Sequence, residues 1–106
     1  MTRDFNEWLD KVNNKRRDYW NSKYTHKEYT PLVKEKGRKY MKLIDDTSVW
    51  GFVCMVDGMN KGVEVKVGDL LMPANWSTPA KHSRGNIFEG TDTWDYFGPS
   101  YLMGVG

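Results

Sequence analysis

The sequence predicts an α+β domain in which one N-terminal amphipathic helix packs on a small, mainly antiparallel, curled sheet of three or four strands. Three observations support this fold class: apolar residues at helical spacing near the start, β-favouring runs in the middle, and aromatics among turn residues toward the end. The length of 106 residues suits a single domain, residues 1–106. Within it we expect a helix in residues 1–24, a sheet over 38–74 and an ordered, irregular C-terminal tail that wraps over 75–106. An open meander with the helix across one face is the alternative arrangement.

The helix is predicted by an apolar stripe in the first segment. Its members recur at helical spacings and are Phe5, Trp8, Leu9, Val12, Tyr19 and Trp20. Arg16 stands where the stripe should continue, and its aliphatic stem can lie along an apolar surface. Asp4 followed by Glu7 resembles a capping box, so we expect the helix from about residue 3 to about residue 22.

The segment after the helix is predicted to lead into the sheet. Residues 25–37 contain Pro31, which disfavours helix at the residue before it, and they allow at most a short helical turn over 31–36. The predicted strands are residues 38–45, 49–56, 63–67 and 70–74, with a loop over 57–62. The run 49–56 is continuously apolar, which is typical of a central strand, whereas 63–67 alternates with its three valines predicted to face inward.

Charge is spread unevenly along the chain. Residues 1–42 contain twelve Lys and Arg against six Asp and Glu, whereas residues 43–106 contain four against eight. This asymmetry is typical of a basic surface for nucleic acid or for an acidic partner, and it also fits a solvated helix facing an acidic sheet. The single cysteine and the lack of an apolar leader or a long apolar run lead us to expect a protein of a reducing cytoplasm, with no membrane partner.

The segment NWSTPAKHSRGNIF, residues 75–88, is the first candidate site. It places Lys81, His82 and Arg84 within four positions, and exposed Lys and Arg can hold a phosphate or carboxylate. Gly85 lets the backbone approach such a ligand closely, and Asn86 follows it. Trp76 offers a stacking face for a base. The alternative interpretation is that Trp76 and the following proline pack on the core, while the charged groups stay solvated or pair with nearby aspartates.

A second candidate is the basic ridge of the helix around Lys15, Arg16 and Arg17. Such a ridge can contact a phosphate backbone without sequence preference, and a solvated helix face is the alternative. Together the predicted binding residues are Lys15, Arg16, Arg17, Trp76, Lys81, His82, Arg84 and Asn86.

Catalysis is a weaker hypothesis. His82 with Cys54 or Ser83 would make a nucleophile and a base, but Cys54 lies in the most apolar run and Ser83 is only a sequence neighbour of the histidine. Two histidines, His26 and His82, and one cysteine are too few for a metal site. We therefore predict no catalytic residues, no metal and no small-molecule cofactor.

The C-terminal two thirds of the chain resemble a group of small uncharacterised proteins of tailed bacteriophages that share a W-x-x-P-A-K-x-x-R-G-N segment. The matching residues are Gly68, Asp69, Leu70, Ala74, Trp76, Pro79, Ala80, Lys81, Arg84, Gly85, Asn86, Gly98, Pro99, Tyr101 and Leu102. The resemblance implies a viral origin and action in the cytoplasm of an infected bacterium, and it does not imply an enzyme.

These observations favour a non-enzymatic phage accessory protein that binds nucleic acid through a basic surface. The alternative is a phage protein that binds or inhibits a host protein or assembles with other phage proteins. A small hydrolase built around His82 is the third hypothesis, and a place in the virion stays open as a further role.

Overall fold

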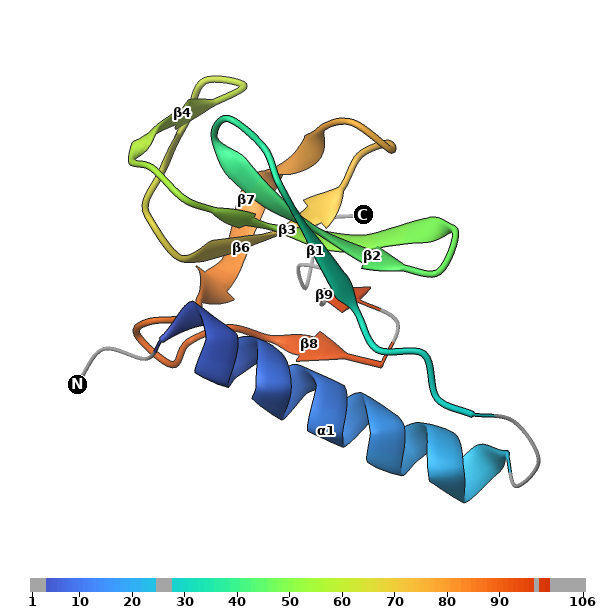
Figure 1. Cartoon of the computed structure of the whole chain (residues 1–106). Coiled ribbons are helices and arrows are strands. Elements are labelled where there is room, and N and C mark those ends of the chain that lie inside the picture. The colour runs from blue at the N-terminus through green and yellow to red at the C-terminus, as the bar shows by residue number, and fades with distance from the viewer. Residues whose placement is uncertain (1–3, 25–27, 97, 100–106) are drawn as a thin grey trace, which may run out of the picture.

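The computed structural model describes residues 4–24, 28–96 and 98–99, which form one helix and nine strands. Helix α1 spans Phe5–Lys23, and the strands are β1 Val33–Lys36, β2 Tyr40–Asp45, β3 Ser48–Cys54, β4 Gly58–Asn60, β5 Val63–Val65, β6 Asp69–Pro73, β7 Pro79–Asn86, β8 Trp94–Asp95 and β9 Gly98–Pro99. The main sheet has the order β1-β2-β3-β6-β7 with antiparallel neighbours, and α1 runs along the lower side of the molecule in Figure 1. The predicted α+β class, with one helix packed on a mainly antiparallel sheet, is confirmed.

Helix α1 begins at Asp4, as its capping side chain predicts. The carboxylate accepts a hydrogen bond from the Asn6 amide at 2.7 Å, which satisfies one of the free amides of the first turn. The helix ends where the Tyr24 amide donates to the Trp20 carbonyl. Its buried face contains Trp8, Leu9, Val12 and Arg16, so the apolar stripe is confirmed and Arg16 does continue it.

The main core lies between α1 and one face of the sheet. It joins Trp8, Leu9, Val12, Leu32, Met41, Leu43, Trp50, Val53, Leu70 and Ile87. Each such side chain contributes about 1.5–3 kcal/mol when it leaves water. The indole amine of Trp8 donates to Asp92 at 2.8 Å and that of Trp50 to the Tyr96 carbonyl at 2.9 Å, so the segment after β7 is tied to the core by polar contacts as well.

The opposite face of the sheet has a smaller core. It contains Phe52, Cys54, Leu71 and, from the β4–β5 hairpin, Val65. The hairpin therefore covers part of this face. Because β3 is covered on both sides, its sequence is apolar at successive positions and does not alternate, which is why a central strand could be predicted there.

The short helical turn predicted over 31–36 is wrong for its larger part, because residues 33–36 form β1. This strand pairs with β2 from Val33 opposite Ile44 to Lys36 opposite Met41. All four residues of β1 are exposed, so its sequence carries no apolar alternation that would announce a strand. Its charges are those that protect a sheet edge from pairing with another chain.

The irregular structure predicted from residue 75 onward is wrong for residues 79–86, which form β7. Five residues of β6 face eight of β7, and the register shifts twice between the pairs Pro73–Pro79, Leu71–Ser83 and Asp69–Asn86. Each shift inserts extra residues and breaks the period of two that marks a strand in a sequence. With β1 and β7 the sheet has five strands, not three or four.

The predicted loop over 57–62 and the predicted strand over 63–67 form the hairpin of β4 and β5. Strand β5 ends at Val65, which is buried, whereas Val67 is 40% exposed and does not face inward. The amide of Val67 donates to the Asp57 carboxylate at 2.8 Å, which holds the chain in a turn at that point. The main sheet is thus a meander that this hairpin interrupts once. Residues 100–106 at the C-terminus lie outside the described residues, as does His26.

Candidate nucleic-acid interface

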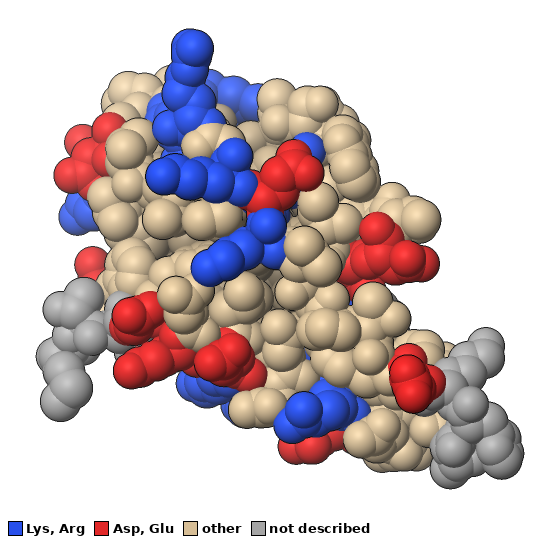
Figure 2. All heavy atoms as spheres, viewed as in Figure 1, with Lys and Arg blue, Asp and Glu red and all other residues tan. Residues whose placement is uncertain are grey.

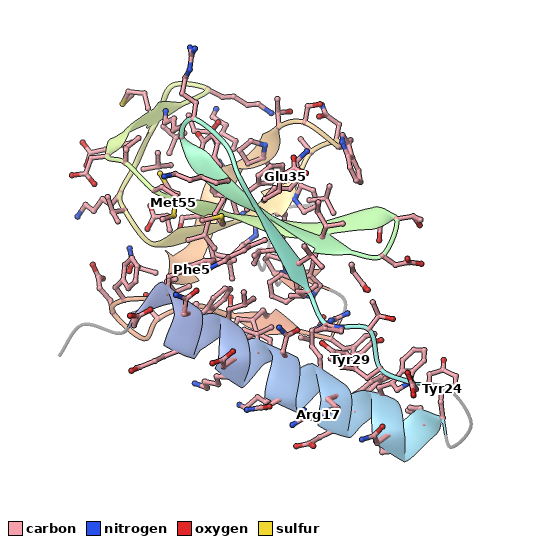
Figure 3. All side chains as sticks on the ribbon, in the orientation of Figure 1. Phe5, Arg17, Tyr24, Tyr29, Glu35 and Met55 are labelled. Carbon is pink, nitrogen blue, oxygen red and sulfur yellow. The ribbon has the colours of Figure 1, made fainter. Side chains whose placement is uncertain are left out.

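The two basic clusters predicted from the sequence belong to different parts of the molecule. Arg17 points away from the sheet on the outer side of α1 (Figure 3) and donates to Asn14 at 2.8 Å. Lys15 lies 5.7 Å from the ring centre of Trp94, along the groove between α1 and residues 90–96. The start of β7 instead contacts the β4–β5 hairpin, where Asn60 donates to the Ala80 carbonyl at 2.8 Å.

Arg16 is not part of a binding surface, because it is only 1% exposed. Its guanidinium donates to the Tyr29 hydroxyl at 2.6 Å, to the Asp45 carboxylate at 2.8 Å and to the Tyr96 carbonyl at 3.2 Å. The rings of Tyr29 and Tyr96 flank it at 5.3 and 4.6 Å. The predicted role of Arg16 in binding is therefore corrected to a structural one. Arg16 joins α1 to the end of β2 at Asp45, to the segment before β1 at Tyr29 and to the residue after β8 at Tyr96.

Asn86 is also corrected to a structural residue. It is 5% exposed, and its amide nitrogen donates to the Val67 carbonyl at 2.9 Å and to Asp69 at 3.1 Å. Its side-chain oxygen accepts from the backbone amides of Phe88 and Glu89. All its polar atoms are engaged in holding the turn after β7, so none is left for a ligand.

The remaining residues of the β7 segment differ in exposure. Lys81 and His82 are exposed, whereas Arg84 is partly buried and its guanidinium donates to the His82 carbonyl and to the Met72 sulfur. Burial lowers the pKa of Arg84, as expected for a cation that is partly withdrawn from water. Lys81 and His82 are thus the more accessible polar side chains of this segment.

The structure gives no support to a nucleophile next to His82. The Cys54 thiol is buried and donates to the Val56 carbonyl at 2.8 Å, and burial raises its pKa. The Ser83 hydroxyl donates to the Gly85 carbonyl at 3.0 Å. Both groups point to backbone oxygens, so neither is arranged for activation by the imidazole.

Trp76 lies at the tip of the β6–β7 hairpin and is 50% exposed. Asn75 fixes this tip, because its side-chain oxygen accepts from the amides of Ser77 and Thr78 at 2.8 and 2.9 Å. The hairpin bends back across the sheet, so that the Lys42 ammonium of β2 lies 4.6 Å from the ring centre of Trp76. Trp76 therefore does not pack into the core, and one side of its ring rests on a lysine.

Below this tip is a groove on the sheet face opposite α1, which we call the β2 groove. Its volume is about 310 Å³, and its lining residues are Glu35, Gly37, Arg38, Lys39, Tyr40, Lys42, Phe52 and Ser77. The strand register explains this set, because Lys42 pairs with Glu35 of β1 on one side and with Phe52 of β3 on the other. Two-residue periodicity places Tyr40 on the same face.

The charges of the β2 groove are unequal. Arg38 is exposed at the β1–β2 turn, and Lys39 reaches across to donate to the Met59 carbonyl of β4. Lys42 lies 3.8 Å from Glu35, the one acidic residue of the groove. The lining of the groove thus has three Lys and Arg against one Glu. Figure 2 shows this basic character over the upper half of the molecule.

The groove along α1 is larger, about 490 Å³, but its charges balance. Lys11 and Lys15 line it together with Asp92 and Asp95, and the third cation of its lining, the buried Arg16, is paired with Asp45. Asp92 also accepts hydrogen bonds from two indole amines, those of Trp8 and Trp94. A polyanion would meet carboxylates along this groove, so the β2 groove is the better candidate for phosphate binding.

Trp76 was predicted as a binding residue from the sequence, whereas the cations beside it were not. Lys42 and Trp76 lie far apart in the chain, and only the fold of the β6–β7 hairpin over the sheet brings them together. The available signal was the excess of Lys and Arg in residues 34–42, a stretch that we divided between the segment 25–37 and the predicted strand 38–45.

No group of three or more His, Cys, Asp and Glu side chains that could hold a metal ion occurs in residues 4–24, 28–96 and 98–99. Over the same residues, no helix has the length and apolar character that crossing a membrane requires.

Comparison with known proteins places the chain in a family without giving it an activity. No curated protein and no solved structure matches it. A family model described as a family of unknown function (DUF7717) matches residues 2–99, which include α1, the sheet and the Trp76 hairpin. Since the match spans nearly the whole chain, this protein belongs to the family of unknown function DUF7717.

Proposed function

We propose that this protein is a non-enzymatic nucleic-acid-binding module that uses the β2 groove and acts in the cytoplasm of a bacterium infected by a phage. The observation that carries the binding proposal is the half-exposed Trp76 beside a groove with three cations, Arg38, Lys39 and Lys42. Cations attract the phosphate backbone, and an exposed indole adds contacts to bases or sugars. The phage setting is supported by the resemblance of the C-terminal two thirds of the sequence.

The cations differ in how they would contribute. Arg38 is exposed and can bind a phosphate with two parallel hydrogen bonds. Lys39 uses one bond on Met59, and an ammonium group has two further donors. The side chain of Lys42 is only 14% exposed, so its main contribution is to hold the Trp76 ring and to add positive potential. Lys81 and His82, exposed on the same hairpin as Trp76, are candidates for outer contacts.

A salt titration of binding to labelled DNA and RNA oligonucleotides tests the proposal. With two to three phosphate contacts, the logarithm of the binding constant should fall with the logarithm of salt concentration with a slope of about −1.5 to −2. Absence of binding at low salt would refute the proposed function.

The location is tested by a matched pair of variants, Arg38→Gln and Arg17→Gln. Both replace one exposed arginine and so change the net charge equally. Arg38→Gln should weaken binding and lower the salt slope by about 0.7, whereas Arg17→Gln should leave the slope nearly unchanged. The opposite result would move the site to α1.

Binding of a host or phage protein is the second candidate. The observation that favours it is an exposed apolar group around the β4–β5 hairpin, in which Val56 is 46%, Met59 57% and Val67 40% exposed. Pull-down from a nuclease-treated bacterial lysate separates the two functions. A partner retained by the native protein and lost with Met59→Ser would support this candidate, whereas loss of all partners on nuclease treatment would exclude it.

A further inference from the structure

We infer that the ligand of the β2 groove is a single-stranded nucleic acid, of which one unpaired base stacks on the open side of Trp76. This inference rests on the proposed function, because it specifies which form of nucleic acid the same site takes. It follows from the geometry of the Trp76 tip, from the size of the groove and from the position of the cations.

The geometry of Trp76 favours a flat ligand. Its indole is half exposed although the Lys42 ammonium covers part of one face, so an extended part of the ring is open to a ligand. Because the cation occupies one face of the ring, a base that stacks on Trp76 must use the opposite face. The bases of a duplex are already stacked on each other and show only their edges, so a base that lies on Trp76 must be unpaired.

The tip is also held in place before a ligand arrives. Asn75 accepts two backbone hydrogen bonds within the turn, and the Ala74 amide donates to the Thr78 carbonyl at 2.9 Å. A stacking residue on an ordered turn loses little conformational freedom on binding. Trp76 thus differs from an exposed aromatic on a loose loop, for which stacking would be offset by the entropy of ordering.

The groove size supports the same class of ligand. A volume of about 310 Å³ is at the lower end of the range for small-molecule pockets. It suits a group of nucleotide size and not the width of a double helix. Arg38 and Lys39 line this volume, so the phosphates flanking a stacked base would meet cations on the same face of the sheet.

The experiment compares four probes at one salt concentration: oligo-dT, oligo-rU, a DNA duplex of equal length, and an abasic DNA strand of equal length. The two single strands with bases should bind at least about tenfold more tightly than the duplex and than the abasic strand. The ratio of the binding constants for oligo-dT and oligo-rU shows whether DNA or RNA is the preferred ligand. Equal binding of all four probes would overturn the inference but leave a nonspecific polyanion site, and binding of none would overturn the proposed function itself.

Variants of Trp76 separate stacking from charge. Trp76→Ala should weaken binding of oligo-dT roughly 5- to 100-fold with an unchanged salt slope, because it removes a ring and no charge. It should leave binding of the abasic strand unchanged. Trp76→Phe, which keeps a ring, should bind at an intermediate level, and the quenching of tryptophan fluorescence by oligo-dT should be lost. Thermal unfolding of both variants serves as the folding control. Unchanged oligo-dT binding by a folded Trp76→Ala would refute the inference.

Discussion

Replacing Arg16 should be among the most destabilising single changes that the described structure offers. The Arg16→Met variant keeps an unbranched apolar stem in the stripe of α1 and removes the guanidinium. In the native protein the Arg16 side chain is fully buried, and its three hydrogen bonds reach the Tyr29 hydroxyl, the Asp45 carboxylate and the Tyr96 carbonyl. Through these bonds Arg16 connects α1 to three separate parts of the described structure: the residues before β1, strand β2 and the residue after β8.

The magnitude follows from what each partner can do after the change. Hydrogen bonds to charged groups contribute about 1.5–3 kcal/mol each, and breaking a buried ion pair costs about 3–5 kcal/mol. Asp45 is 32% exposed and can take up water, and the Tyr29 hydroxyl keeps its bond to Asn13 at 2.7 Å. These two facts place the cost near the lower end, at about 3 kcal/mol. For a domain of this size the melting temperature should fall by about 12 °C or more.

Urea denaturation of Arg16→Met, Asp45→Ala and the double variant measures this cost. Asp45→Ala should be at least as damaging, because it leaves a fully buried cation without its counter-charge, whereas Arg16→Met leaves a carboxylate that water can reach. The double variant should lose about 1–3 kcal/mol less than the sum of the single losses. Arg17→Gln, on the next residue of the helix but exposed, is the control and should change stability by less than about 0.5 kcal/mol. A loss below about 1 kcal/mol for Arg16→Met, or strict additivity, would refute the reasoning.

Three further predictions test other parts of the fold. Gly85→Ala should destabilise by more than about 2 kcal/mol, since Gly85 has φ of +95° and a β-carbon there would lie 2.0 Å from the Thr91 carbonyl oxygen. The control is Gly62→Ala, which shares the positive φ but meets no described atom within 4 Å, and a similar loss in urea for both would rule out the clash. Asn75→Ala should loosen the hairpin tip and weaken oligo-dT binding several-fold while lowering the melting temperature only slightly; binding at the native level would show that the turn does not need this fixation. Burial raises the pKa of four acidic side chains, which are Tyr29, Tyr40, Cys54 and Tyr96. Because the unfolded chain releases these protons at lower pH than the folded chain, the free energy of unfolding should be level to about pH 8 and fall above it. Urea titrations at pH values up to about 10.5 measure this fall. A constant free energy of unfolding over that range would contradict the assignment.

The sequence predicted the elements whose burial follows a regular period and missed those whose burial does not. Helix α1 has one apolar face, and β3 has no polar residue from Val49 onward, so each has a pattern that can be recognised without knowledge of its neighbours. Strand β7 has no such pattern because two register shifts separate its buried positions. Strand β1 buries none of its residues and depends on pairing with β2 alone.

Only part of the candidate site could be predicted, because its residues come together through the fold and not through a local pattern. Trp76 could be chosen from the sequence as a stacking residue, because a tryptophan among turn residues is conspicuous. Whether its ring would be buried depended on the course of the β6–β7 hairpin, which the sequence did not reveal. Arg16 shows the opposite error, since its residue type suggested a surface cation while its position in the stripe placed it in the core.

The fate of the positive charge in residues 1–42 follows from these placements. Helix α1 contains five Lys and Arg and three Asp and Glu, but Arg16 is neutralised by Asp45 inside the fold, which leaves a net +1 on its surface. Residues 33–42 keep a net +4. The charge asymmetry along the sequence is therefore mainly a property of the β1–β2 hairpin and only slightly of the helix. Lys34 of this hairpin reaches α1 and donates to Asn6, whereas Arg38, Lys39 and Lys42 line the β2 groove with Glu35 as its acidic residue. Since screened attraction falls off within about 10 Å, a polyanion should be held at these three cations, of which Lys42 lies against Trp76.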